Sequence, residues 1–174
     1  YTKTGTENHK EVVQKLFTLL NDKGYLEEQV SSQPYSEESE MFLSDRYIEG
    51  DCPHCPSRTK GDQCDNCGQD FEPSDLKNLI STIDNSKVTF KETNHIYLKL
   101  PKFQENLNKW INSKSYWRPS VKNQSLGFLS NGLIDRAITR DIDWGVEVPI
   151  KNYEKKRIYV WFEAVIGYLS ASIE

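Results

Sequence analysis

The first third of the chain combines one helical pattern with one polar stretch. Its apolar positions recur at the three- and four-residue spacing that fills a single helix face: Val12, Val13, Leu16, Phe17, Leu19 and Leu20. Thr6 stands where an N-cap belongs, and Gly24 provides a stop signal. The pattern therefore predicts a helix between Thr6 and Gly24. Residues 31–40 are almost entirely polar and predict a connector.

The middle of the chain mixes alternating and helical patterns. Apolar and polar residues alternate on either side of residues 92–95, which predicts two short strands at 88–90 and 96–100. Two helices are predicted next, one after Pro101 and one opened by Pro119. The first rests on Phe103, Leu107, Trp110 and Ile111, and the second on Leu126, Phe128, Leu129 and Leu133, with interruptions at Gly127 and Gly132.

The last third has a different character. Residues 158–162 are apolar at every position, as a strand buried within a parallel sheet requires, and residues 164–173 continue as a helix. This order is typical of half a βαβ unit. Ligands of open α/β sheets bind beyond the carboxyl ends of the strands, so residues 161–168 are expected near a small-molecule pocket. The charged segment at 135–145 is interpreted as a site loop.

The four cysteines of the chain form two pairs, each with two residues between its members, and eight residues separate the pairs: Cys52, Cys55, Cys64 and Cys67. Two such turns can supply the four thiolates of a structural Zn²⁺ site. Gly68 follows the last cysteine, where a positive φ would turn backbone amides toward the sulfurs. A structural zinc knuckle is the favoured interpretation. A disulfide or redox pair and a different metal remain alternatives.

Charge and length limit the classes of function. The chain has 174 residues and a formal net charge of −4. Between Asp45 and Glu72, around the cysteines, seven acidic residues outnumber three basic ones. Binding to phosphates needs the opposite balance, so we expect an architectural knuckle and no DNA partner. The sequence shows no membrane span and no signal segment, and we expect a soluble, cytoplasmic protein.

Four segments of the sequence resemble one family. RAITRDIDWG, YVWFEAVIGYLSAS, MFLSDRYIEGDCPHC and CDNCG are similar to segments of the methionyl-tRNA synthetases, which are class I aminoacyl-tRNA synthetases. The resemblance runs through nearly the whole chain. It implies an α/β fold: a partial Rossmann-type catalytic domain with an inserted small zinc-knuckle connective-peptide domain. The ATP-binding HIGH and KMSKS sequences of the family are absent here, so we expect an internal fragment that is inactive alone.

The resemblance also divides the chain. Residues 1–30 correspond to part of the first Rossmann half. Residues 31–118 correspond to the connective-peptide insertion, with the knuckle at 45–72. Residues 119–174 correspond to the return into the second Rossmann half, with part of the methionine pocket.

The activity implied by the resemblance has two steps. Methionine reacts with ATP, which carries Mg²⁺, and the methionyl group then passes to tRNA. Four residues match the methionine pocket of the family: Trp161, Ala164, Val165 and Tyr168. Aromatic edges suit a thioether, and a tyrosine hydroxyl can donate to its sulfur. Val165 stands where many members have proline. Arg140 matches an arginine of the activation step, and Asp141 is expected to orient it.

Other interpretations stay open. Trp161 and Tyr168 could be core aromatics, and Arg140 with Asp141 could belong to a solvated ion-pair loop. His9 and His95 are expected to have no direct role. Two other function classes remain: a zinc-ribbon adaptor or nucleic-acid-binding module, and another class I synthetase. The small insertion argues against the leucine, isoleucine and valine enzymes, whose editing insertion is much larger.

Overall fold

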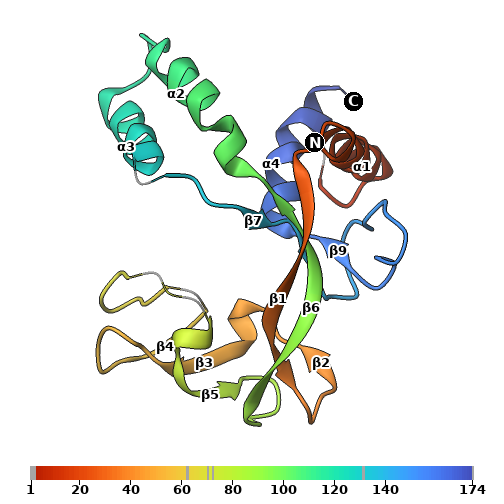
Figure 1. The fold of residues 1–174 in the computed structure, drawn as a ribbon, viewed down its shortest axis with the longest axis vertical. Coiled ribbons are helices and arrows are strands. Elements are labelled where there is room, and N and C mark those ends of the chain that lie inside the picture. The colour runs from red at the N-terminus through yellow and green to blue at the C-terminus, as the bar shows by residue number, and fades with distance from the viewer. Residues whose placement is uncertain (1–2, 62, 70, 72, 131, 174) are drawn as a thin grey trace. The chain divides into compact units, whose positions relative to one another are not determined.

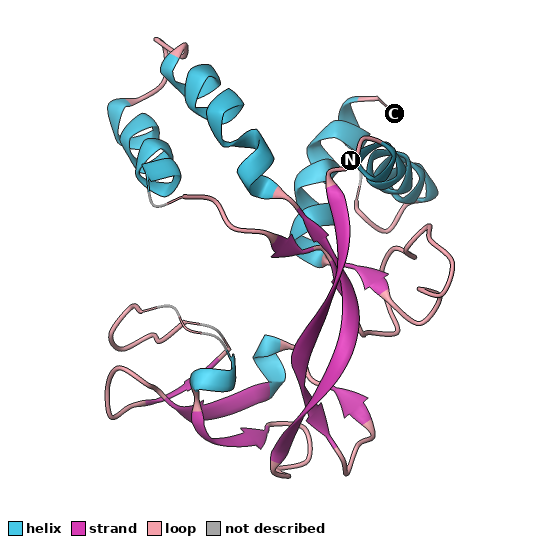
Figure 2. Cartoon of the chain, in the orientation of Figure 1, coloured by secondary structure: helices cyan, strands magenta, loops and turns pink. Residues whose placement is uncertain are grey.

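The computed structural model describes residues 3–61, 63–69, 71, 73–130 and 132–173 (Figure 1). Helices and strands are mixed throughout the chain, which confirms the predicted α/β class (Figure 2). The chain divides into two compact units. Unit 1 extends up to Gln29 and resumes at His95, and unit 2 is Val30–Asn94. Both boundaries fall within long strands, β1 (Leu26–Ser36) and β6 (Val88–Leu98).

The first helix, α1 (Glu7–Asp22), confirms the predicted helix and both of its end signals. The Thr6 side chain accepts a hydrogen bond from the backbone N–H of His9 at 3.3 Å. Gly24, just beyond the helix, has a φ of +71°. Phe17 is fully buried in α1, where it meets Phe162 of α4 (Val160–Ser172) edge to face. Figure 1 shows these two helices side by side.

The core of unit 1 forms around this helix pair. Its buried apolar residues come from α1, from the ends of β1 and β6, and from the segment between residues 138 and 166. They are Val12, Val13, Phe17, Leu26, Ile96, Ile138, Val146, Val148, Tyr153, Ile158 and Ile166. The core thus joins the first helix of the chain to its last one.

The connector predicted at residues 31–40 is wrong for residues 31–36, which continue β1, and right for residues 37–40, which form a turn. β1 is followed by a turn and by β2 (Met41–Phe42), with Tyr35 opposite Phe42 in the antiparallel register. The prediction of two short strands is also wrong, since β6 is one continuous strand of 11 residues. The polar side chains at 92 and 94 are exposed to solvent, so the strand continues through them without an apolar residue at these positions.

Unit 2 contains a three-stranded antiparallel sheet in the order β4 (Arg58–Lys60), β3 (Ile48–Asp51), β5 (Lys77–Ser81). Two single-turn helices flank it, at Asp45–Tyr47 and Pro73–Asp75. Two of the cysteines belong to the small core beside this sheet, which consists of Leu43, Ile48, Cys52, Cys64, Phe71, Leu76 and Val88. The folding of unit 2 is therefore tied to the state of its thiols.

The helices predicted after Pro101 and Pro119 are confirmed. A short 3₁₀ turn at Leu100–Phe103 leads into α2 (Gln104–Asn112), and α3 is Pro119–Ser130. Gly127 lies within α3 instead of interrupting it. Gly132 adopts a φ of +81° beyond the end of α3.

The strand predicted at 158–162 is wrong beyond its first residue. Only Arg157–Ile158 forms a strand, β9, and it pairs antiparallel with β8 (Thr139–Arg140). A further strand, β7 (Arg136–Ala137), pairs antiparallel with the end of β6. α4 already begins at Val160, because the apolar side chain of Phe162 packs on Phe17 as part of a helix face. None of the helices in the described part of the chain has the length and apolar character that crossing a membrane requires.

Candidate functional site

The four cysteines lie on two turns that the backbone closes by hydrogen bonds. The N–H of Cys52 donates to the carbonyl of Ser57 at 2.9 Å. In the second turn the N–H of Gly68 donates to the carbonyl of Cys64 at 2.8 Å. Gly68 has a φ of +69°, so the positive φ predicted for it is confirmed. Each turn therefore directs two sulfurs toward the same point.

The sulfur positions match a tetrahedral metal site. Sγ of Cys52 lies 3.8 Å from Sγ of Cys67, and Sγ of Cys55 lies 3.7 Å from Sγ of Cys64. All four sulfurs lie within 4.8 Å of one another. Four thiolates at the Zn–S distance of about 2.3 Å, at the corners of a tetrahedron, are about 3.8 Å apart. All four cysteines are free thiols, which the disulfide alternative does not fit.

The electrostatics of the thiols also favour a bound cation. Hydrogen bonds from the backbone of Ser57 and the side chain of Asn66 lower the pKa of Cys55 to about 6. A backbone bond from Gln69 acts in the same direction on Cys67, but burial and the neighbouring sulfurs raise its pKa to about 11. Four adjacent thiolates repel one another, and a divalent cation among them removes this repulsion. The donor set thus fits a soft or borderline metal.

Two of the three basic residues of the knuckle, Arg58 and Lys60, are engaged with its acidic residues. Arg58 pairs with Glu49 at 3.0 Å and with Asp51 at 3.1 Å, and Lys60 lies 3.8 Å from Glu49. Among the acidic residues counted from the sequence, Asp62, Asp70 and Glu72 lie outside the described residues. The paired bases support an architectural knuckle, because a phosphate-binding surface needs unpaired cations.

Arg140, on β8, is held at the start of α4. Its Nη1 donates to the carbonyls of Thr139 at 2.9 Å and Ala137 at 3.2 Å. Its guanidinium carbon lies 3.9 Å from the ring centroid of Tyr159, the N-cap residue of α4. The cation therefore lies on the ring of Tyr159, which is two residues before Trp161 in the chain. The alternative of a solvated ion-pair loop does not fit these contacts of Arg140.

Asp141 pairs with a buried histidine and a partly buried lysine. Its Oδ2 lies 3.1 Å from Nε2 of His95, and its Oδ1 accepts a bond from Nζ of Lys156. Burial acts to raise the pKa of Asp141, but the bonds from His95 and Lys156 outweigh it and lower the pKa overall. The expectation that Asp141 orients Arg140 stays a prediction. Sequence reasoning missed His95, because no local pattern connects it with a carboxylate 46 positions later.

The four residues predicted for the methionine pocket share α4. Trp161, Val165 and Tyr168 are spaced by four and three residues, and their side chains are 69%, 68% and 85% exposed. Ala164 lies beside them and is half-buried. The opposite face of the helix is buried and includes Ile166. The structure therefore gathers these residues on one exposed apolar face, and the reading of Trp161 and Tyr168 as core aromatics does not fit their exposure.

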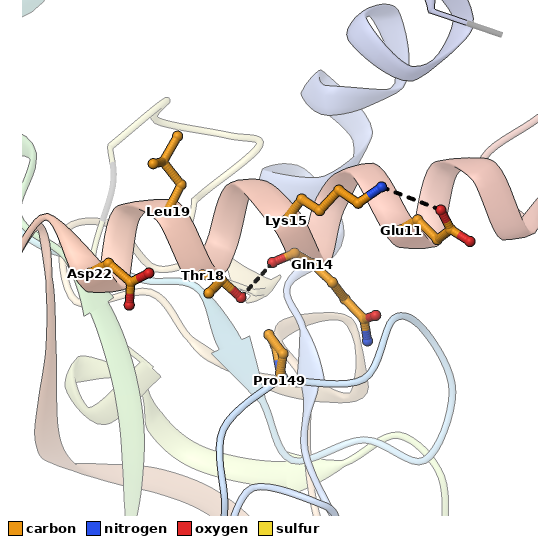
Figure 3. A pocket seen from close by; sticks show the side chains of 7 residues that line it. All are labelled: Glu11, Gln14, Lys15, Thr18, Leu19, Asp22 and Pro149. Carbon is orange, nitrogen blue, oxygen red and sulfur yellow. Dashed lines mark hydrogen bonds and ion pairs between the residues drawn. The ribbon is translucent and has the colours of Figure 1, made fainter.

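A surface depression lies elsewhere, along the outer side of α1 (Figure 3). It is lined by Glu11, Gln14, Lys15, Thr18, Leu19, Asp22 and Pro149. None of the predicted site residues lines it. The depression is wide open to solvent, whereas a small-molecule pocket is concave and buries most of its ligand.

Comparison with known proteins identifies one family. The family model described as "tRNA synthetases class I (M)" matches residues 1–174. The methionine–tRNA ligase of Dehalococcoides mccartyi is 50% identical over 175 residues, which cover 100% of this chain and 32% of that protein. The methionine–tRNA ligase of Thermoplasma volcanium is 43% identical over 173 residues, covering 99% of this chain and 32% of that protein. The chain thus spans about a third of the length of these relatives.

A solved structure has the same fold. It is the methionyl-tRNA synthetase of Mycobacterium tuberculosis bound by methionyl-adenylate, with a TM-score of 0.62 and 21% sequence identity. The match covers 98% of this chain and 29% of that one. At this level of identity the likeness shows the fold alone.

Proposed function

The chain belongs to the class I methionyl-tRNA synthetases, and on that premise we propose that it is part of an enzyme that activates methionine with ATP and transfers it to tRNA. The observation that carries the proposal is the 50% identity to a methionine–tRNA ligase over 100% of this chain. A zinc-ribbon adaptor would not need the segments outside the knuckle to match such an enzyme. The proposed enzyme acts in the cytoplasm, with methionine, ATP and tRNA as partners and without DNA or membrane.

We further propose that the metal of the knuckle is Zn²⁺. Cys52, Cys55, Cys64 and Cys67 would hold it, because their sulfur spacing agrees with tetrahedral thiolate coordination. A fully thiolate-bound zinc has no open position for a substrate, so its role is structural. Two of the four ligands are core residues of unit 2, which links metal binding to the folding of that unit.

The proposed methionine pocket uses the exposed face of α4. The edges of Trp161 and Tyr168 suit the polarisable thioether, and the Tyr168 hydroxyl can donate to its sulfur. Ala164 and Val165 would complete the apolar wall. Val165 lies on this exposed face, so the variation from proline concerns one contact surface and leaves the helix intact. The strong exposure of these side chains supports a role in contacts made outside this chain.

Arg140 is proposed to act in the activation step. An oxygen of the methionine carboxylate attacks the α-phosphorus of ATP, the bond from that phosphorus to the bridging oxygen breaks, and pyrophosphate leaves. Mg²⁺ carried by ATP supplies charge neutralisation on the phosphates. Arg140 contributes a permanent cation at the N-terminus of α4, where it can bind the carboxylate or phosphate oxygens. Asp141 would fix the backbone beside it.

In the same scheme residues 1–30 contribute to the first Rossmann half. Residues 31–118 form the connective-peptide insertion around the knuckle, and residues 119–174 lead into the second Rossmann half. This chain lacks the HIGH and KMSKS sequences, so we propose that it is inactive by itself.

Methionine-dependent ATP–pyrophosphate exchange by the full-length protein tests this proposal through two variants. Arg140→Ala should mainly lower kcat, since it removes charge stabilisation, whereas Tyr168→Ala should mainly raise the KM for methionine. Leu19→Ala, on the outer side of α1, serves as the control and should leave both constants unchanged. Full activity of Arg140→Ala together with an unchanged KM of Tyr168→Ala would contradict the assignment of both residues.

A further inference from the structure

A chain of buried hydrogen bonds reaches both sequence neighbours of Arg140. His95 is 1% exposed, and Thr139, immediately before Arg140, is 0% exposed. Nδ1 of His95 lies 3.0 Å from Oγ1 of Thr139. Nε2 of the same ring lies 3.1 Å from Oδ2 of Asp141, immediately after Arg140. One imidazole therefore bridges the residues on both sides of the arginine.

The series of hydrogen bonds continues beyond Thr139 and beyond Asp141. Oγ1 of Thr139 accepts a hydrogen bond from the backbone N–H of Ile96 at 3.0 Å. The N–H of Ile138 in turn donates to the carbonyl of Ile96 at 2.8 Å. At the other end, Lys156 donates to Oδ1 of Asp141. The segment around Arg140 is thereby fastened to β6 through side chains as well as through the backbone.

The donors and acceptors of this hydrogen-bond network fit one arrangement of protons. Burial lowers the pKa of His95 despite the opposing effect of Asp141, so the ring is neutral near pH 7 and carries one N–H. The carboxylate of Asp141 can only accept, so Nε2 of His95 donates to it. Nδ1 is then the acceptor, and the Thr139 hydroxyl donates a hydrogen bond to it. The hydroxyl oxygen remains free to accept the N–H of Ile96.

The side chain of Arg140 extends from this buried segment toward the start of α4. Its backbone pairs with Arg157 in the β8–β9 ladder, and its guanidinium stacks over the Tyr159 ring at 3.9 Å. The Nη1 group uses the carbonyls of Ala137 and Thr139. These contacts hold one edge of the guanidinium, and the planar group has further N–H donors to offer a reactant.

We infer that His95 and Thr139 are positioning residues for Arg140: the imidazole, bonded to Thr139 and Asp141, holds the backbone at 139–141 and so fixes where the guanidinium is presented. The inference rests on the role of Arg140 in the proposed function. Both side chains are buried, so we assign them no contact of their own with a reactant. The chemistry demands such support because a displacement of about 1 Å at a reacting centre can cost about 100-fold in rate.

The matched pair Thr139→Val and Thr139→Ser tests this in the full-length protein. Valine keeps the shape but removes the hydroxyl, which leaves Nδ1 of His95 and the N–H of Ile96 without their partner. Serine keeps the hydroxyl. In methionine-dependent ATP–pyrophosphate exchange, Thr139→Val should lower kcat by about 10- to 100-fold and change the KM for methionine less than about twofold, the pattern also expected of Arg140→Ala. Thr139→Ser should retain kcat within about threefold.

A second measurement separates this inference from the proposed function. Amide hydrogen exchange of the peptide covering residues 136–142 should accelerate in Thr139→Val and stay unchanged in Thr139→Ser, whatever the enzyme does. If Arg140→Ala kept full activity, the proposed role of Arg140 would fail. The amide hydrogen exchange data would still show whether His95 and Thr139 stabilise the backbone at 139–141. The inference is overturned if Thr139→Val has the kcat of the wild type while Arg140→Ala does not. It is also overturned if Thr139→Val leaves the amide hydrogen exchange of residues 136–142 unchanged. The same holds if Thr139→Ser lowers kcat as much as Thr139→Val.

Discussion

Replacing Cys64 with serine should release the knuckle metal. Cys64 is 1% exposed, and its sulfur lies 3.7 Å from that of Cys55, so it contributes both to the metal site and to the core of unit 2. Structural zinc contributes about 10–16 kcal/mol in zinc-finger peptides. Divided over four ligands, this is about 3 kcal/mol for each, which corresponds to about a 100-fold or greater loss of affinity.

The assay combines metal content with limited proteolysis. Wild-type protein purified without chelator should contain one zinc per chain from this site. Cys64→Ser should lose it and become sensitive to cleavage between residues 52 and 67. Asn66→Ala is the matched control: it removes a single 3.5 Å hydrogen bond to Sγ of Cys55 and should keep the metal. Wild-type protein with four titratable thiols and no zinc would refute the reasoning, as would a Cys64→Ser variant that keeps a full equivalent.

Three further predictions concern stability, each followed by urea unfolding. Phe17→Ala, at a fully buried position, should lose about 3–5 kcal/mol, while Leu19→Ala, at a position 47% exposed, should lose less than about 1 kcal/mol; equal losses would contradict the packing of α1 on α4. Gly50→Ala should destabilise unit 2, because the new Cβ would lie 2.8 Å from the carbonyl oxygen of Lys77; a neutral effect would contradict the β3–β5 register. The pKa of Asp141 is lowered in the folded protein, so its stabilising contribution is present above the usual carboxyl pKa of 3.8 and is lost as the pH falls below it. Asp141→Asn should therefore reduce the loss in the free energy of unfolding at acidic pH. An unchanged loss would contradict the pairing of Asp141 with His95 and Lys156.

Local signals account for the features that the sequence predicted correctly. α1 has its N-cap at Thr6, its apolar stripe and its terminating Gly24 within one continuous stretch. The metal site was equally accessible, because two short turns contain all four ligands. The exposed aromatic residues of α4 came from family resemblance, since periodicity alone cannot distinguish a pocket wall from a core face.

The features that were missed depend on distant contacts. A short apolar run fits a buried strand or a buried helix equally well. The packing of Phe162 on Phe17, 145 positions earlier, decides for the helix. β1 and β6 carry exposed polar side chains, so their side-chain pattern does not predict strands over their full length. Backbone pairing with neighbouring strands makes them extended. His95 likewise becomes significant only when folding brings Thr139 and Asp141 to its two ring nitrogens.

The central claim is that this chain is part of an enzyme that activates methionine. Pyrophosphate exchange into ATP by the wild-type full-length protein, measured with each amino acid in turn, tests this claim most directly. The account predicts exchange with methionine and at least about 100-fold lower kcat/KM with leucine, isoleucine and valine, whose side chains offer no sulfur to the Tyr168 hydroxyl. Exchange that is absent with methionine, or is faster with one of these three amino acids, would contradict it.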